Sequence, residues 1–147
     1  MTVTDYQSLA EFRHQVRRFL RFSELTARSG GLEPRQYQLL LAIKGLPAAA
    51  RPRVAELAER LQIQHHSAVE LANRLETGGY VQRHRADGDR REVLLSLTPK
   101  GDRVLNHMAL RHREELRVLG PALLEALQRV LEGAAVTKTA RSTRRRE

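Results

Sequence analysis

The sequence predicts a mainly α-helical chain with one small β-hairpin, and three observations carry this prediction. Apolar residues recur every three or four positions through most of the chain. The apolar period changes to two after Gly78-Gly79. Glycine and proline pairs divide the helical stretches into separate elements. With 147 residues, the chain has the length of one domain rather than of two independent ones.

The first predicted helix runs from Thr4 to about Ala27. Thr4 and Gln7 have the spacing of a capping box, which satisfies free backbone donors at a helix start. Apolar residues follow a helical period at Leu9, Phe12, Val16, Phe19 and Leu20. A helix of roughly 24 residues is about 36 Å long. Because that exceeds the interior of so small a domain, we expect it to pack on a partner element or a second subunit.

Three shorter helices are predicted next. The first starts at Pro34, a favoured first helical residue, and ends near Gly45-Leu46-Pro47. The second spans residues 53–61, and a break at 62–64 separates it from a third that stops at the double glycine. Each of the last two keeps its apolar residues on one side, at Val54, Leu57, Ala58 and Leu61 and at Ala68, Leu71, Ala72 and Leu75.

Two short strands follow, at residues 80–85 and 92–97, around the turn-forming pair Asp87-Gly88. Thr98-Pro99 then has the residue types of a helix cap and first turn, and it begins a second long helix. We expect Gly120-Pro121 to break that helix and a last helix to follow.

The last predicted segment, residues 137–147, is a disordered basic tail, since it contains no large apolar side chain. It is either a solvated end without a role or an arm that binds phosphates non-specifically. The whole chain has 26 Lys and Arg against 17 Asp and Glu, a net charge of +9. This balance favours a polyanionic partner, with nucleic acid as the leading candidate.

The residue types needed for several other kinds of site are missing from the sequence. The absence of cysteine excludes disulfides, thiolate zinc sites and iron–sulfur clusters. Nucleophile elbows, phosphate-cradling glycine loops and HExxH motifs do not occur. Although His65 and His66 are adjacent, neighbours on a helix point about 100° apart, and no further ligand completes a set. We therefore predict no enzyme activity, no cofactor and no metal.

Two short helices joined by a tight turn and followed by a hairpin with a basic tip form a winged helix-turn-helix. The second helix of this motif fits the major groove of B-DNA, and residues near its N-terminus reach base edges. On this chain those positions are Gln64, His65, His66, Ser67 and Glu70, with Arg74 expected on a phosphate. Ser67 and Glu70 also have capping-box spacing, so Glu70 is either a base contact or a capping or surface charge.

The hairpin concentrates positive charge at Arg83, Arg85, Arg90 and Arg91. An arginine at a hairpin tip can enter a narrow minor groove, where the negative potential is enhanced. A solvated charged turn is the plainer alternative, but the neighbouring helix-turn-helix favours DNA binding.

The central part of the chain, about residues 32–101, resembles the MarR family of bacterial transcription regulators. The family's wing motif is Asp-x-Arg followed by Leu-Thr-x-x-Gly, and Asp89-Arg90-Arg91 and Leu97-Thr98-Pro99-Lys100-Gly101 fit it without a gap. Val54–Leu61 and the passage from Arg74-Leu75-Glu76 into Gly79-Tyr80-Val81 carry the rest of the likeness. The resemblance implies that Arg90 and Arg91 enter the minor groove while Asp89 holds the wing in shape.

Two departures from the family concern the recognition helix. Many relatives begin it with Ser-Pro-Ser-Thr where this chain has Gln64-His65-His66-Ser67, and many carry Arg at the position of Glu70. The operator therefore cannot be transferred from relatives.

The resemblance also implies a homodimer and divides the chain accordingly. Residues 1–31 form an N-terminal dimerisation helix, 32–98 the winged lobe and 99–136 the C-terminal dimerisation helices. A small aromatic or anionic effector is expected in a cleft between the dimer helices and the winged lobe. Tyr37, Phe12, Phe19 and Phe22 could line that cleft, although ordinary core is the plainer interpretation. His112 is either a pH-sensitive interface residue or a hydrogen-bonded or partly solvated histidine.

The predicted function is a transcription regulator, expected to be a repressor, that binds double-stranded DNA as a homodimer at a pseudo-palindromic operator and is released by the effector. We expect it in the cytoplasm at the nucleoid and away from membranes, since no apolar run or signal-peptide pattern occurs. The alternative is a basic architectural or RNA-binding winged-helix protein with little base readout.

Overall fold

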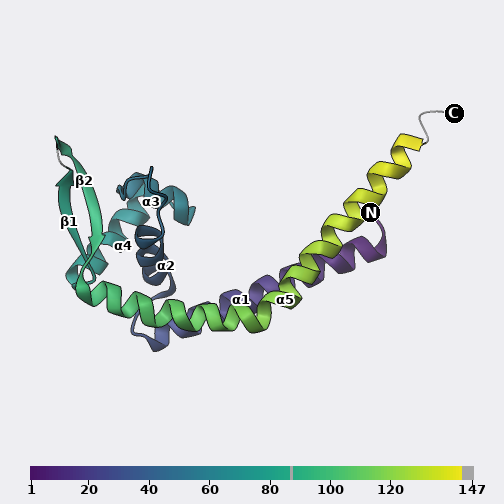
Figure 1. Cartoon of the computed structure of the whole chain (residues 1–147), viewed down its shortest axis with the longest axis horizontal. Coiled ribbons are helices and arrows are strands. Elements are labelled where there is room, and N and C mark those ends of the chain that lie inside the picture. Colours follow the sequence, from purple (N-terminus) through teal and green to yellow (C-terminus); the bar gives the residue numbers. More distant parts are fainter. Residues whose placement is uncertain (87, 144–147) are drawn as a thin grey trace. The chain divides into compact units, whose positions relative to one another are not determined.

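The computed structural model describes residues 1–86 and 88–143, with residues 89, 90 and 134–143 as backbone only. The prediction of a mainly α-helical fold with one small hairpin is confirmed (Figure 1). In chain order the elements are α1 (Val3–Ser29), α2 (Pro34–Lys44), α3 (Val54–Leu61), α4 (His65–Thr77), β1 (Val81–Ala86), β2 (Asp89–Leu97) and α5 (Pro99–Thr143).

The chain divides into two compact units. The winged unit is Glu24–Arg111 and contains α2, α3, α4 and the β1–β2 hairpin with the adjoining ends of α1 and α5. The helical unit is formed by Met1–Ser23 together with the chain from His112 onward. No described helix has an apolar stretch long enough to span a membrane.

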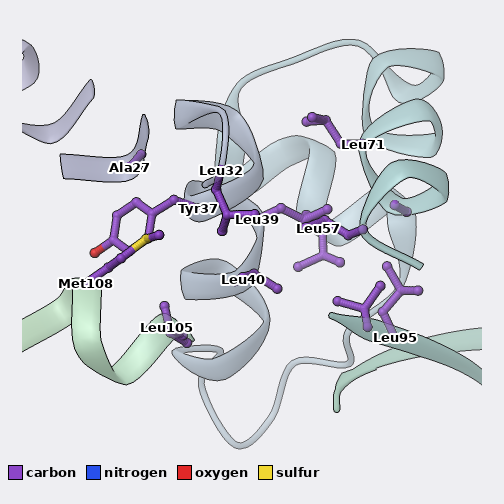
Figure 2. Close-up of a cluster of buried hydrophobic side chains, with 13 residues drawn as sticks. Ala27, Leu32, Tyr37, Leu39, Leu40, Leu57, Leu71, Leu95, Leu105 and Met108 are labelled. Atoms are coloured by element: carbon purple, nitrogen blue, oxygen red, sulfur yellow. The ribbon is translucent and has the colours of Figure 1, made fainter. Parts of the chain in front are cut away.

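One apolar cluster forms the core of the winged unit, and Figure 2 shows its side chains converging from all of the unit's elements. Its members are Ala27, Leu32, Tyr37, Leu39, Leu40, Leu57, Leu71, Ala72, Leu75, Val81, Leu95, Leu105 and Met108. The periodic apolar positions predicted for α3 and α4 supply four of them, because those faces point inward. Each fully buried leucine contributes about 1.5–3 kcal/mol. The cluster therefore fixes α4 and the hairpin relative to each other.

The hairpin pairs β1 with β2 in antiparallel register, from Val81 opposite Leu97 to Arg85 opposite Val93. An irregularity between Arg85 and Ala86 then places Ala86 opposite Asp89. The second strand thus begins three residues earlier than predicted. Gly88 has a φ of +86°, a left-handed conformation that favours glycine, as expected for this turn.

The start of α1 differs from the prediction. The helix begins at Val3 and the capping pair is Thr2 with Asp5, so the predicted box at Thr4 and Gln7 is wrong. The Thr2 N–H donates to the Asp5 carboxylate at 2.6 Å, and the Asp5 N–H donates to the Thr2 hydroxyl at 3.2 Å. These bonds, the backbone one first, lower the pKa of Asp5. An ionised carboxylate at a helix start is also favoured by the helix dipole.

The predicted break at Gly120-Pro121 is also wrong, because α5 continues through Pro121. A proline inside a helix removes one hydrogen bond and costs about 3 kcal/mol. On either side of Pro121, however, α5 buries side chains at His112 and Ala126, which are 6% and 3% exposed. We attribute the continuous helix to this packing.

The same helix extends past Thr137 to Thr143, so the backbone of residues 137–143 is helical where disorder was expected. Lengthening an existing helix requires no new nucleation, which is the unfavourable step. The remainder of the predicted tail, residues 144–147, lies outside the described residues.

Candidate nucleic-acid interface

The turn between α3 and α4 is short and closed by hydrogen bonds. Gln62 has a φ of +52°, in the left-handed region, and its side chain donates to the Glu59 carbonyl at 2.8 Å. The Ile63 N–H donates to the Ala58 carbonyl at 3.1 Å. These contacts end α3 and let α4 start within three residues, as a helix-turn-helix requires.

Helix α4 has one buried face and one exposed face. Ala68, Leu71, Ala72 and Leu75 are buried. The predicted recognition residues lie on the rest of the helix surface: Gln64, His65, His66, Glu70 and Arg74 are exposed, and Ser67 is half-buried. The 3.6-residue period thus separates the core positions of α4 from the side chains offered to a ligand.

The capping-box alternative for Ser67 and Glu70 is wrong. Gln64 is the N-cap of α4, with extended backbone at φ −65° and ψ 149°, and its side chain does not cap the helix. Ser67 is therefore already the third helical residue. Within the described part of the chain, the Glu70 carboxylate makes no hydrogen bond or ion pair, so it remains a surface charge.

Among the predicted wing residues, Arg83 connects the hairpin to α4. Its guanidinium donates to the Glu76 carboxylate at 2.9 Å and to the Asn73 side-chain oxygen at 2.6 Å. Charge-assisted bonds of this kind are short and directional. Arg83 therefore holds β1 against α4, and much of its donor capacity is used within the protein.

The other wing residues lie nearer the turn. Arg85 and Arg91 are exposed. Asp89 and Arg90 belong to β2, while the roles predicted for their side chains fall outside the described atoms. Arg91 and His65 line the same groove of about 770 Å³, so the structure brings the start of α4 and the wing together.

The same groove contains two arginines that the sequence analysis did not single out. Arg51 and Arg53 precede α3, and both pair with the Glu92 carboxylate of β2. The only sequence signal for them is an Arg-Pro-Arg triplet next to a predicted helix start. Their pairing with Glu92 is a tertiary contact, so sequence spacing could not reveal it.

The base of the hairpin explains the Leu-Thr-x-x-Gly motif. The Thr98 hydroxyl donates to the Gly79 carbonyl at 2.6 Å and accepts from the Gly101 N–H at 3.1 Å. A Cβ on Gly101 would lie 2.1 Å from the Tyr80 carbonyl oxygen, so this close approach requires glycine. Lys100 donates to the Gly78 carbonyl at 2.8 Å and lies 4.4 Å from the Tyr80 ring centre. The motif thus locks the hairpin base to the end of α4.

Of the residues considered for an effector cleft, Tyr37 is buried, whereas Phe12, Phe19 and Phe22 are half-buried in the helical unit. Tyr37 lies in the winged core next to Met108 (Figure 2), and burial raises the pKa of its phenol. In the helical unit, His112 is buried, its Nε2 is 2.9 Å from the Ser23 hydroxyl, and its ring meets Phe22 edge-on. The hydrogen-bonded alternative for His112 is therefore the one observed. Among the described residues, no three side chains of the His, Cys, Asp or Glu types could share a metal ion.

Comparison with known proteins bears on the same segment. The sequence pattern of the MarR family matches residues 30–92. The transcriptional regulator PecS of Dickeya dadantii is 30% identical over 93 residues, which cover 61% of this chain and 55% of PecS. A regulatory protein for the hcr operon of Thauera aromatica is 29% identical over 63% of this chain and 54% of its own length. The matched region thus spans little more than half of each of these relatives.

Solved structures match over nearly the whole chain. AbsC, a MarR family regulator from Streptomyces coelicolor, gives a TM-score of 0.72 at 21% identity, covering 98% of this chain and 97% of AbsC. A mutant MarR from E. coli complexed with operator DNA gives 0.61 at 20% identity, covering 87% and 89% of the two chains. At this identity the structures show a shared fold. Together with the sequence match at residues 30–92, they make the chain similar to regulators of the MarR family.

Proposed function

We propose that the chain is a transcription regulator that binds double-stranded DNA sequence-specifically at a pseudo-palindromic operator and represses there. The carrying observation is that one rigid unit presents the exposed face of α4 beside an arginine-bearing wing. The core and the Thr98–Gly101 lock hold these two surfaces at a set spacing, as simultaneous contact with two grooves requires. The E. coli MarR mutant of the same fold is bound to operator DNA.

In this proposal the solvent face of α4 lies in the major groove. Gln64, His65, His66, Ser67 and Glu70 contact base edges, where glutamine suits adenine, histidine guanine and glutamate cytosine. Arg74 contacts a phosphate one turn further along the helix. Arg85, Arg90 and Arg91 serve the minor groove, with Asp89 shaping the wing. Arg83 contributes by holding the wing against α4.

We further propose that the chain forms a homodimer through residues 1–31 and 99–136, which include helices of the helical unit. Large apolar side chains are exposed on both of its helices. They are Val3, Tyr6, Leu9 and Leu20 on α1 and Leu116, Val118, Leu124, Leu127 and Leu131 on α5. Exposed large apolar side chains along two helices are typical of an interaction surface. A second copy also supplies the second α4 that a two-fold operator needs.

Regulation completes the proposal. A small aromatic or anionic effector lowers operator affinity by favouring a different spacing of the two α4 helices. This part is supported by the likeness to the MarR family. The proposed setting is the cytoplasm, at the nucleoid.

The proposal is tested by selecting binding sites from genomic fragments and titrating the selected duplex against a scrambled one at several salt concentrations. We expect a palindromic motif with half-sites about one helical turn apart. The selected duplex should bind at least ~10³-fold more tightly than the scrambled duplex. Equal affinity for both would instead support the basic architectural alternative.

A further inference from the structure

The start of α3, the start of α4 and β2 form a groove whose charged and histidine lining residues are Arg51, Arg53, His65, Arg91 and Glu92. We propose that it binds a phosphate of the DNA backbone, and that Glu92 is a positioning residue that holds two of its arginines without contacting DNA. The inference rests on the proposed function and adds to it a phosphate site and a positioning residue.

Glu92 gathers the two arginines that precede α3. Its side chain is only 13% exposed and pairs with Arg51 and, at 3.5 Å, with Arg53. The arginine side chains remain 54% and 56% exposed, and neither has another ion pair or side-chain hydrogen bond among the described residues. A guanidinium has five N–H donors. Both arginines therefore keep donors for an anion after pairing with Glu92.

The backbone carrying these arginines is anchored on both sides of Pro52. The Arg53 N–H donates to the Arg51 carbonyl at 2.8 Å, which closes a tight turn over the proline. The Leu95 N–H of β2 donates to the Pro52 carbonyl at 2.9 Å. Because proline also restricts its own φ, the turn is stiff before any ligand arrives. Binding an anion here orders little additional chain, which favours affinity.

The first turn of α3 adds donors to the same groove. Val54 and Ala55, its first two residues, line the groove, and the N-cap Arg53 provides no side-chain cap. The first N–H groups of a helix lack intrahelical partners and carry partial positive charge. They complement the arginines in binding an oxyanion.

The position of the groove identifies a backbone phosphate as the ligand. His65 is the first residue of α4, and Arg91 belongs to the wing. An anion between them lies between the element proposed for the major groove and the one proposed for the minor groove. Phosphate contacts fix the register of a protein on DNA without carrying sequence information. The site would therefore set how deeply both elements enter their grooves.

The sharpest test is Glu92→Gln, because two possible roles of this carboxylate predict opposite changes in DNA affinity: positioning the arginines, or only repelling the DNA. If Glu92 positions the arginines, the variant weakens DNA binding by about two- to fivefold although the net charge rises by one. A carboxylate that merely opposed DNA would, on removal, strengthen binding. Glu125→Gln is the matched control, since it removes a carboxylate paired with Arg129 at 2.6 Å in the helical unit. We expect its affinity to equal or slightly exceed that of the wild type.

A double variant, Arg51→Gln with Arg53→Gln, measures the phosphate contact directly. It should lower the slope of log affinity against log salt by about two, equally for selected and scrambled duplexes. Partial unfolding reduces the active fraction but leaves this slope unchanged, so folding defects are distinguishable. Replacing chloride by inorganic phosphate at equal ionic strength should not displace the duplex.

Three results would overturn the inference: an affinity gain in Glu92→Gln that matches the control, a wild-type slope in the double variant, or selective competition by free phosphate. Failure of the wild-type protein to bind any duplex would instead overturn the proposed function.

Discussion

The winged unit buries most of its large apolar side chains, whereas the helical unit leaves many of them exposed. In the winged unit the large apolar residues converge in one cluster, and among its described residues only Leu25, Leu41 and Leu110 are large apolar residues with an exposed side chain. In the helical unit, large apolar side chains remain exposed along both α1 and α5. A folded unit that buries its apolar surface needs no partner, whereas one that exposes it is completed by another surface. The comparison supports the proposal that the first unit binds DNA and the second forms the dimer.

The largest effect is expected from making the exposed surface of the helical unit polar. The double variant Leu124→Glu with Leu131→Glu should give a monomer in sedimentation velocity, because charged residues cannot be buried unpaired at an interface. Operator affinity should then fall by about 10²-fold or more, since two linked half-site contacts become independent. Leu41→Glu, on an exposed leucine of the winged unit, is the control and should remain dimeric. A dimeric double variant would refute the assignment of assembly to this surface.

The next effect tests whether the winged unit is stabilised by its own core. Leu57→Ala removes a fully buried side chain and should lower the free energy of unfolding by about 2–5 kcal/mol. Thermal unfolding followed by circular dichroism measures this loss. Leu127→Ala, at a 37% exposed position in the helical unit, should change the stability of the monomeric double variant much less. Equal losses at both positions would remove the distinction between the units.

A smaller effect is expected from the wing. Arg91→Ala should weaken binding to the selected operator by about tenfold, the size of one specific DNA contact. Because the side chain is exposed, the unfolding transition should not move. Deleting residues 138–147 is the comparison in the other unit and should reduce the salt slope without changing sequence preference. If Arg91→Ala binds the operator like the wild type, the minor-groove role is wrong.

The smallest expected effect is a pH dependence of the free energy of unfolding that arises from the core of the winged unit. Burial raises the pKa of Tyr37, so the folded chain retains a proton that the unfolded chain loses above about pH 10. The contribution to stability is therefore complete below that pH and is lost as the pH rises further. The denaturant concentration at the midpoint of unfolding should therefore fall as the pH rises in this range. Tyr37→Phe should remove the part of this fall that is due to the tyrosine. Tyr6→Phe, at an exposed tyrosine of the helical unit, should leave the fall unchanged. A loss of the dependence in Tyr6→Phe alone would contradict the assignment.

Local sequence signals predicted most of the winged unit. Pro34, the periodic leucines of α3 and α4, and Gly88 in the hairpin turn each determine conformation through their nearest neighbours. The recognition face of α4 followed from the same period. The helix break predicted at Pro121 from the local sequence was wrong. The helix is continuous there, and α5 buries side chains on both sides of the proline. The capping-box alternative at Ser67 was also wrong, because α4 had already begun at His65.

The sequence by itself determined the order of the elements, the basic character of the wing and the two departures from the family in the recognition helix. These properties depend on residue type and short-range spacing, both of which are explicit in the chain. The tertiary structure alone decided which arginines act together. Glu92 holds Arg51 and Arg53 across some forty residues, and Arg83 uses its donors on α4 rather than at the hairpin tip. Such pairings depend on the three-dimensional approach of distant segments, because charge attraction selects whichever partner the packed core brings within reach.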